Sequence, residues 1–238
     1  KTLAGDTDAQ IIGLARALER DVDAAVDAGV DVVEIFAPVS DLQLEHLLGS
    51  SREEMLTMVS DTVDYISDRG AVPHVTLADA FRADPEHIAE VFETVPDVPF
   101  VNLADSVGAR TPASVQARFD DLKGRIDLDR LGVHFHDDMG CGTANALTAY
   151  QIGVAKADVS VASLGERAGN SSLEEVIVSC AVDNDDDLGI ETSELIPTCR
   201  GILETLGEEW DDRKAILGQK VAEHESSIHT AAMLSDPD

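Results

Sequence analysis

The sequence is poor in basic residues and in cysteine, and both shortages narrow its possible functions. Only 17 Lys and Arg accompany 47 Asp and Glu, which gives a formal net charge of −30. Nucleic-acid binding requires Lys and Arg at the phosphates, so this balance argues against a nucleic-acid partner. The three cysteines include no CxxC pair, which argues against a disulfide framework or a zinc knuckle and favours reduced thiols.

Long hydrophobic runs are also missing. No apolar run approaches the roughly 18 residues of a transmembrane helix, and no signal-like segment opens the chain, so we expect no membrane partner. Apolar residues make up 44% of the chain, which is enough for a core. The acidic residues punctuate regular apolar periods and so do not indicate disorder. Because molar salt would screen their repulsion over about 3 Å, we expect a cytoplasmic protein of a salt-accumulating halophile.

Strand and helix patterns alternate along the chain. The predicted strands cover residues 11–17, 31–37, 71–77, 99–104, 131–135 and 157–163. A helical pattern follows each strand, and one of these helices is preceded by Ser51 with Glu54 three residues later, the pattern of a capping box. Strict alternation without hairpins predicts parallel strands joined by crossover helices, and hence an α/β fold.

An open sheet and a closed barrel both fit this alternation. An open dinucleotide-binding sheet would show GxGxxG after its first strand, and that motif is absent. Polar residues at the carboxyl ends of the strands favour a barrel instead. A barrel of this geometry needs eight strands, however, and only six are visible.

Two histidines mark the carboxyl end of the fifth predicted strand. Residues two apart in a strand point to the same face, so the imidazoles of His134 and His136 should lie together, as metal ligands do in a barrel mouth. An isolated HxH more often reflects packing. The next strand, however, ends in residues 165–170, Gly-Glu-Arg-Ala-Gly-Asn, and the coincidence of two polar strand ends favours a functional site.

These two segments carry a family resemblance. His134-Phe-His-Asp-Asp-Met-Gly140 with Ala144-Asn145, followed by residues 165–170, resembles the 2-isopropylmalate, homocitrate and citramalate synthases. These are acyl-CoA-condensing (β/α)8 barrels related to hydroxymethylglutaryl-CoA lyase. The lyases carry Gly-Cys-Pro where this chain has Gly-Glu-Arg, so the synthases are favoured.

The resemblance implies a (β/α)8 TIM barrel over residues 1–190, containing strands three to eight, with the first two strand-helix units missing. Residues 191–238 would begin a helical linker subdomain. The resemblance further implies a divalent metal, Mg²⁺, Mn²⁺ or Zn²⁺, that binds a 2-oxo acid, with acetyl-CoA as co-substrate.

The resemblance also assigns the metal ligands. His134 and His136 would be two of them, and Asn170 is a third candidate that could equally cap the helix expected from Ser171. The remaining protein ligand of the family is an acid on the first strand, beside an arginine. Neither lies in this chain.

Further site residues follow from shorter matches. Asp-Ser-Val-Gly at 105–108 resembles the family's D-T-V-G, which implies that the Ser106 hydroxyl contacts the substrate carboxylate. Thr-Leu-Ala-Asp at 76–79 resembles S-x-E-D, so Thr76 and Asp79 are substrate-binding candidates while Ala78 replaces the family's glutamate.

A last match lies near the end of the chain. Residues 224–229, HESSIH, resemble the family's HESGIH, which assigns catalytic roles to His224 and Glu225 and implies a homodimer in which His224 serves the partner's active site. An exposed histidine without a role is an equal alternative for His224. Among the other residues, we expect His46 and His87 to face solvent.

Three functions remain open. The first is a metal-dependent Claisen condensation of acetyl-CoA with a 2-oxo acid, an acyltransferase step of amino-acid biosynthesis. The second is a catalytically reduced paralogue or fragment that binds a metabolite or a partner subunit, suggested by the absent acid and arginine and by Ala78. The third is an aldolase or lyase on the same barrel.

Overall fold

A computed structural model describes residues 8–183, 188–224 and 226. The chain divides into two compact units, each with its own core. The first comprises residues 1–159 and 165–171, and the second comprises residues 160–164 and 172–238. Among the described residues, no helix is both long and apolar enough to cross a membrane.

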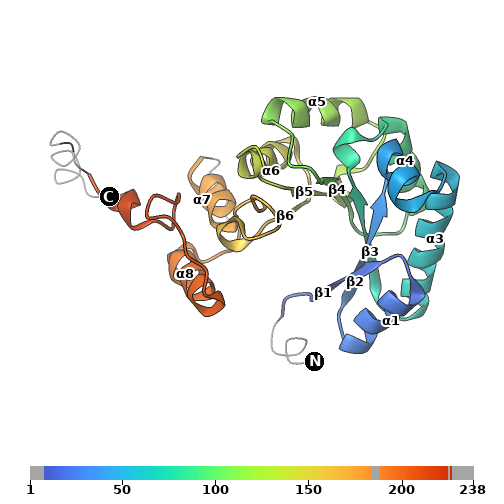
Figure 1. Ribbon diagram of the computed structural model, residues 1–238, viewed down its shortest axis with the longest axis horizontal. Coiled ribbons are helices and arrows are strands. Elements are labelled where there is room, and N and C mark those ends of the chain that lie inside the picture. The colour runs from blue at the N-terminus through green and yellow to red at the C-terminus, as the bar shows by residue number, and fades with distance from the viewer. Residues whose placement is uncertain (1–7, 184–187, 225, 227–238) are drawn as a thin grey trace. The chain divides into compact units, whose positions relative to one another are not determined.

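The first unit is built on one sheet of six parallel strands, which neighbour one another in chain order (Figure 1). The strands are β1 (Ile12–Arg16), β2 (Val32–Pro38), β3 (Val72–Ala78), β4 (Val101–Asp105), β5 (Leu131–Phe135) and β6 (Lys156–Asp158). The helices between them are α1 (Glu19–Ala28), α2 (Asp41–Gln43), α3 (Arg52–Asp68), α4 (Pro85–Thr94), α5 (Pro112–Leu122) and α6 (Gly142–Ile152). The predicted alternation and parallel α/β fold are confirmed.

The two faces of the sheet have different surroundings. Alternate residues of a strand point to opposite faces. On β2, Val33 and Ile35 belong to the face that the helices cover, and both are fully buried. Glu34 and Phe36 point the other way, to the inner face, where Phe36 is 42% exposed. The hydrophobic core of this unit therefore lies between the sheet and the helices, while the inner face carries polar side chains.

The helix α3 begins and ends as the sequence indicates. Ser51 accepts a hydrogen bond from the Glu54 backbone N–H, and the Glu54 carboxylate accepts one from the Ser51 N–H, which completes the predicted capping box. After the helix, Gly70 adopts φ +84, a left-handed conformation that glycine enters without a steric penalty.

The predicted strand over residues 157–163 is much shorter in the structure. The strand β6 ends at Asp158, and Val161–Ser163 form a 3₁₀ turn. Ala162 and Ser163 have φ values of 51 and 62, which an extended strand cannot contain. The helix expected from Ser171 begins at Leu173.

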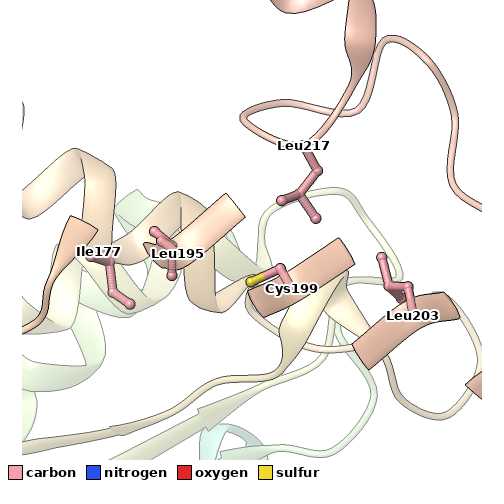
Figure 2. Packing of buried hydrophobic residues seen from close by; sticks show 5 residues of the cluster. All are labelled: Ile177, Leu195, Cys199, Leu203 and Leu217. Carbon is pink, nitrogen blue, oxygen red and sulfur yellow. The ribbon is translucent and has the colours of Figure 1, made fainter. Parts of the chain in front are cut away.

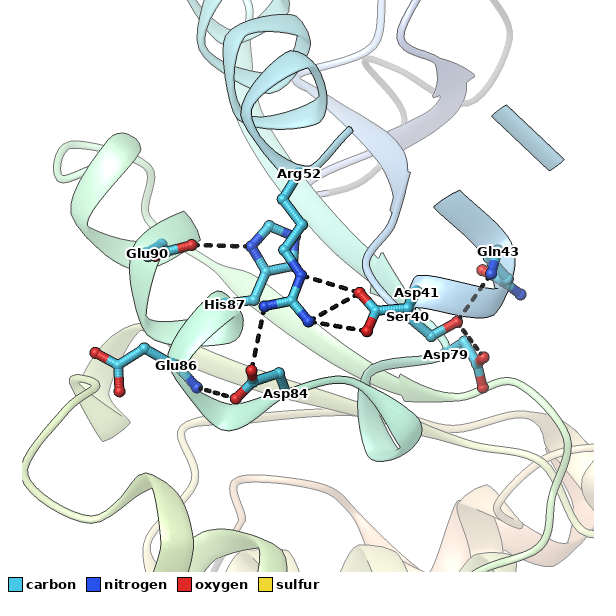
Figure 3. Close-up of polar contacts among 9 residues, drawn as sticks. All are labelled: Ser40, Asp41, Gln43, Arg52, Asp79, Asp84, Glu86, His87 and Glu90. Carbon is cyan, nitrogen blue, oxygen red and sulfur yellow. Dashed lines mark hydrogen bonds and ion pairs between the residues drawn. The ribbon is translucent and has the colours of Figure 1, made fainter. Parts of the chain in front are cut away.

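The expectation that His87 faces solvent is wrong, whereas His46 is exposed as predicted. His87 lies on α4, is fully buried, and places Nδ1 3.1 Å from the Glu90 carboxylate. Arg52 of α3 pairs with Asp84, the residue before α4, at 3.1 Å (Figure 3). The helix α3 packs against α4 and so buries His87, although the polar sequence around this residue predicts exposure to solvent.

The second unit contains the helices α7 (Leu173–Asp183) and α8 (Leu195–Leu206) and a short 3₁₀ turn at Gln219–Ala222. Its core, drawn in Figure 2, is formed by Ile177, Leu195, Cys199, Leu203 and Leu217. The guanidinium of Arg200 donates hydrogen bonds of 3.1 and 2.6 Å to the Leu217 carbonyl and so holds the loop after α8 against this core.

Candidate active site

The two predicted metal-binding histidines lie together at the carboxyl end of β5. Nε2 of His134 is 3.4 Å from Nε2 of His136, and the rings meet edge to face with centroids 5.0 Å apart. Both nitrogens could bond one ion at the usual ~2.0–2.1 Å, so the pair fits a shared metal. No cluster of three or more His, Cys, Asp or Glu around a metal position is found in the described part of the chain.

The other ring nitrogens have different surroundings. Nδ1 of His134 lies 3.4 Å from the Asp158 carboxylate. Nδ1 of His136 is buried without a hydrogen-bond partner among the described residues. Burial, followed by the positive charges of His134 and Arg167, lowers the pKa of His136. The lowered pKa favours the neutral imidazole, which is the form that binds a metal.

Asn170 is placed beside His136 by the backbone. The two residues form an antiparallel bridge, flanked by hydrogen bonds from the Asp137 N–H to the Gly169 carbonyl and from the Ser171 N–H to the Phe135 carbonyl. Directly opposed residues point to the same side, with Cβ atoms roughly 4.5–5.5 Å apart. The carboxamide of Asn170 also packs closely on Gly165, where an added Cβ would meet its Nδ2 at 2.4 Å.

An exposed arginine joins the three loops at this end of the sheet. The guanidinium of Arg167 donates two hydrogen bonds to the Asp138 carboxylate, at 2.9 and 2.8 Å, and one to the Ser106 carbonyl at 3.0 Å. Gly108 packs against Asp138 so tightly that a Cβ would lie 2.2 Å from its carboxylate. The loops after β4, β5 and β6 are therefore tied together around the histidine pair.

Two of the predicted substrate-binding residues lie together after β3 and β4. The Asp79 N–H donates to Ser106 Oγ at 2.8 Å. The Asp79 carboxylate is 2% exposed and accepts hydrogen bonds from Ser40, drawn in Figure 3, and from Arg82, each at 2.6 Å. Asp79 is thus engaged within the protein, whereas the Ser106 O–H has no acceptor among the described residues.

Thr76 belongs to a buried polar network on the inner face of the sheet. Its hydroxyl donates to Glu34 Oε1 at 2.6 Å and accepts from Asn102 Nδ2 at 3.0 Å. Burial raises the pKa of Glu34, but hydrogen bonds from His74 and Thr76, together with the charge of Lys156, outweigh burial and lower it to about 2. Glu34 is therefore an ionised carboxylate inside the fold.

A groove of about 480 Å³ runs along this inner face beside His134. Its apolar side is formed by Ile12, Leu14 and Phe36, and its polar side includes Glu34, Lys156 and Asp158. The sequence motifs did not predict a role for these three charged residues. The signal was present, since a glutamate at position 34 interrupts a run of β-branched strand residues, but sequence alone does not tell which residues oppose it.

The predicted catalytic residue His224 belongs to the second unit. His224 is exposed and follows the 3₁₀ turn of the second unit. Glu225 lies outside the described residues.

With the fold and the histidine pair established, comparison with known proteins identifies the family. Residues 2–200 match the model of the HMGL-like family. The chain belongs to the HMGL-like family.

Its relatives include three proteins of Methanopyrus kandleri. The chain is 38% identical over 231 residues to the homocitrate synthase AksA of Methanopyrus kandleri, covering 96% of this chain and 58% of that protein. It is 35% identical to a probable 2-isopropylmalate synthase of the same organism, with coverage of 98% and 47%, and 34% identical to its putative (R)-citramalate synthase CimA, with coverage of 97% and 46%. The chain therefore spans about half the length of these relatives.

Solved structures support the fold. The hydroxymethylglutaryl-CoA lyase of Bacillus subtilis superposes with a TM-score of 0.76, covering 89% of this chain and 74% of the lyase, at 21% identity. The homologous enzyme of Pseudomonas aeruginosa gives a TM-score of 0.75, also at 21% identity, with coverage of 88% and 73%. The HMGL-like chain thus shares its fold with the lyases, and the resemblance deduced from the sequence motifs is confirmed.

Proposed function

We propose that this chain is part of an acyltransferase that condenses acetyl-CoA with a 2-oxo acid to give a 2-hydroxy dicarboxylic acid. The observation that carries the proposal is the convergence of the His134 and His136 Nε2 atoms at the carboxyl end of β5. Identities of 34–38% to proteins named as homocitrate, 2-isopropylmalate and citramalate synthases favour this reaction.

The proposal includes a divalent metal, Mg²⁺, Mn²⁺ or Zn²⁺, held by His134, His136 and the carboxamide of Asn170. When bound, such an ion supplies Lewis-acid stabilisation of negative charge on a carbonyl oxygen. The two imidazoles would hold the ion through their Nε2 atoms, and the 2-oxo acid would bind beside them. The Arg167–Asp138 pair would keep the surrounding loops in place.

Ser106 is the best placed of the proposed substrate-binding residues. A hydroxyl has one proton to donate, and the Ser106 oxygen already accepts from the Asp79 N–H. Its O–H can therefore donate to the carboxylate of a 2-oxo acid. Asp79 would hold Ser106 in position, and Thr76 would act through Glu34 on the inner face of the sheet.

The remaining parts of the proposal concern the rest of the chain. His224 and Glu225 would assist proton transfer in the active site of a partner subunit, so the protein would be a homodimer in the cytoplasm, acting in amino-acid biosynthesis. The division into a barrel domain over residues 1–190 and a linker subdomain over residues 191–238 belongs to the same proposal.

The reaction is tested by CoA release in molar KCl with Mg²⁺, Mn²⁺ or Zn²⁺. Acetyl-CoA would be supplied with pyruvate, 2-oxoisovalerate or 2-oxoglutarate, using the full-length gene product from its own cells beside the 238-residue chain. Metal-dependent release that His134→Ala abolishes and His46→Ala leaves unchanged supports the proposal. A full-length product that releases no CoA with any of these acids would overturn it.

A second candidate is a non-catalytic relative that binds a metabolite or a partner subunit. It is favoured by Ala78, where the family resemblance implies a glutamate. It is also favoured by the Asp79 carboxylate, which already accepts hydrogen bonds from Ser40 and Arg82. Binding of a 2-oxo acid without CoA release, unchanged in Ala78→Glu, would support it. Activity gained in Ala78→Glu would contradict it. A lyase is less favoured, because at 21% identity the lyase structures show a common fold alone.

A further inference from the structure

A line of charged side chains leads across the inner face of the sheet to His134. Lys156 Nζ is 3.3 Å from Glu34 Oε2 and 2.9 Å from Asp158 Oδ1. Asp158 Oδ2 in turn lies 3.4 Å from Nδ1 of His134. We propose that Asp158 is a positioning residue for His134, and that the Glu34–Lys156 pair holds Asp158 in place.

The strand register produces this arrangement. In the parallel pairing of β5 and β6, His134 is the partner of Asp158, so both side chains leave the same face on neighbouring strands. Lys156 lies two residues before Asp158 and shares that face. The side chain of Lys156 then reaches the carboxylate of Glu34, which comes from β2 on the far side of the inner face.

At the other end of this line of charges, Glu34 is buried and hydrogen-bonded. This carboxylate is 4% exposed and also accepts the hydroxyl hydrogen bond of Thr76 at 2.6 Å. Lys156 bridges it to Asp158, with the ammonium 3.3 Å from the Glu34 carboxylate and 2.9 Å from the Asp158 carboxylate. Asp158 is thereby held on the side of His134 away from His136.

The consequence for His134 is a defined tautomer. A carboxylate at Nδ1 favours the proton on that nitrogen and leaves the Nε2 lone pair for a metal. Nε2 of His134 is the atom that faces Nε2 of His136 at 3.4 Å. Asp158 therefore aims the ligand atom at the proposed metal position, and this inference rests on the proposed function.

The first readout requires no metal and no turnover. Two-bond ¹H–¹⁵N NMR spectra distinguish the Nδ1–H from the Nε2–H tautomer, and His134→Gln identifies the His134 signals. We expect the Nδ1–H form in the wild type, a mixture of tautomers in Asp158→Ala, and the wild-type form in Asp129→Asn. Asp129 is an exposed acid just before β5. Its substitution therefore removes one negative charge outside the site.

The second readout is binding of Mn²⁺ alone, measured by titration calorimetry. We expect Asp158→Ala to raise the Kd for Mn²⁺ about 10–100-fold, the usual loss when a carboxylate behind a histidine ligand is removed. Asp158→Asn keeps a hydrogen-bond acceptor of the same shape and should lose less Mn²⁺ affinity than Asp158→Ala. Lys156→Met should also lower the Mn²⁺ affinity. Circular dichroism checks that each variant is folded, and Asp158→Asn replaces Asp158→Ala if the latter is not.

The outcomes separate the two proposals. A wild type that binds no Mn²⁺ but whose His134 tautomer changes in the Asp158 variants overturns the metal site and supports the positioning role. Variants of Asp158 with the wild-type tautomer and the wild-type Mn²⁺ affinity overturn the positioning role and leave the metal site standing.

Discussion

Lys156 on β6 and Glu34 on β2 form an ion pair, 3.3 Å between Nζ and Oε2, although three strands separate them in the sheet. Neighbouring strands lie about 4.8 Å apart, so a flat sheet would hold β2 and β6 roughly 19 Å from each other. The ion pair is possible only because the sheet curves toward its inner face. This single ion pair therefore shows that the sheet is curved like the wall of a barrel.

Protonation of Glu34 should weaken the fold at low pH. Its pKa falls from 4.5 to about 2 on folding, so its ionised form stabilises the fold fully above about pH 4.5, and this contribution is lost as the pH falls to about 2. We expect urea unfolding to show wild type more stable than Glu34→Gln by at most about 3 kcal/mol near neutral pH. The difference should shrink through this window as the pH is lowered, and a difference that stays constant with pH would contradict the assignment.

Removal of either histidine should abolish tight metal binding. Removing a metal ligand weakens metal binding more than removing a residue that only hydrogen-bonds to a ligand. We therefore expect His136→Ala to raise the Kd for Mn²⁺ or Zn²⁺ more than about 100-fold. The matched control is His46→Ala, because His46 is exposed and far along the chain from the pair. Titration calorimetry measures both. Equal losses in the two variants would show that binding is unspecific.

Two glycine-to-alanine substitutions should act in opposite directions. A Cβ at Gly132 on β5 would lie 1.7 Å from Asn102 Oδ1, so we expect Gly132→Ala to destabilise the fold by about 1–3 kcal/mol. A Cβ at Gly201 in α8 would point into open space, so Gly201→Ala should stabilise the fold by up to about 1 kcal/mol. Chemical unfolding measures both changes.

The cause of the Gly132 effect can be tested separately. Asn102→Ala removes the side chain that the new Cβ would meet. In a double-mutant cycle, the cost of Gly132→Ala should therefore be smaller in the Asn102→Ala background. An undiminished cost would show that the backbone at Gly132, and not the Asn102 contact, causes the loss.

Salt should stabilise the protein strongly. At a net charge of −30, repulsion within the folded chain is screened over about 10 Å at 0.1 M salt and about 3 Å at 1 M. We expect the thermal unfolding midpoint to rise steadily with KCl up to the molar range. Glycine betaine at equal osmolality is the control for solvent effects other than screening. A midpoint that betaine raises as much as KCl would contradict the electrostatic explanation.

Local patterns determined much of this protein. The alternation of strands and helices, the capping box at Ser51 and the shared face of His134 and His136 all depend on neighbours within a few residues, so the sequence was enough to predict them. The same local reasoning was wrong for His87 and for the length of β6. Burial of His87 depends on the packing of α3 against α4. The strand β6 ends at Asp158, and the backbone turns to positive φ at Ala162 and Ser163, inside the predicted strand.

The sequence by itself therefore determined the class of fold, the family and the histidine pair, because periodicity and motif spacing are properties of adjacent residues. Only the tertiary structure decided that Glu34, Lys156 and Asp158 form a chain of ion pairs that ends at His134. It also decided that the Asp79 carboxylate accepts a hydrogen bond from Ser40. Those contacts join residues up to 122 positions apart, and they exist because parallel strands in register curve around a common inner face.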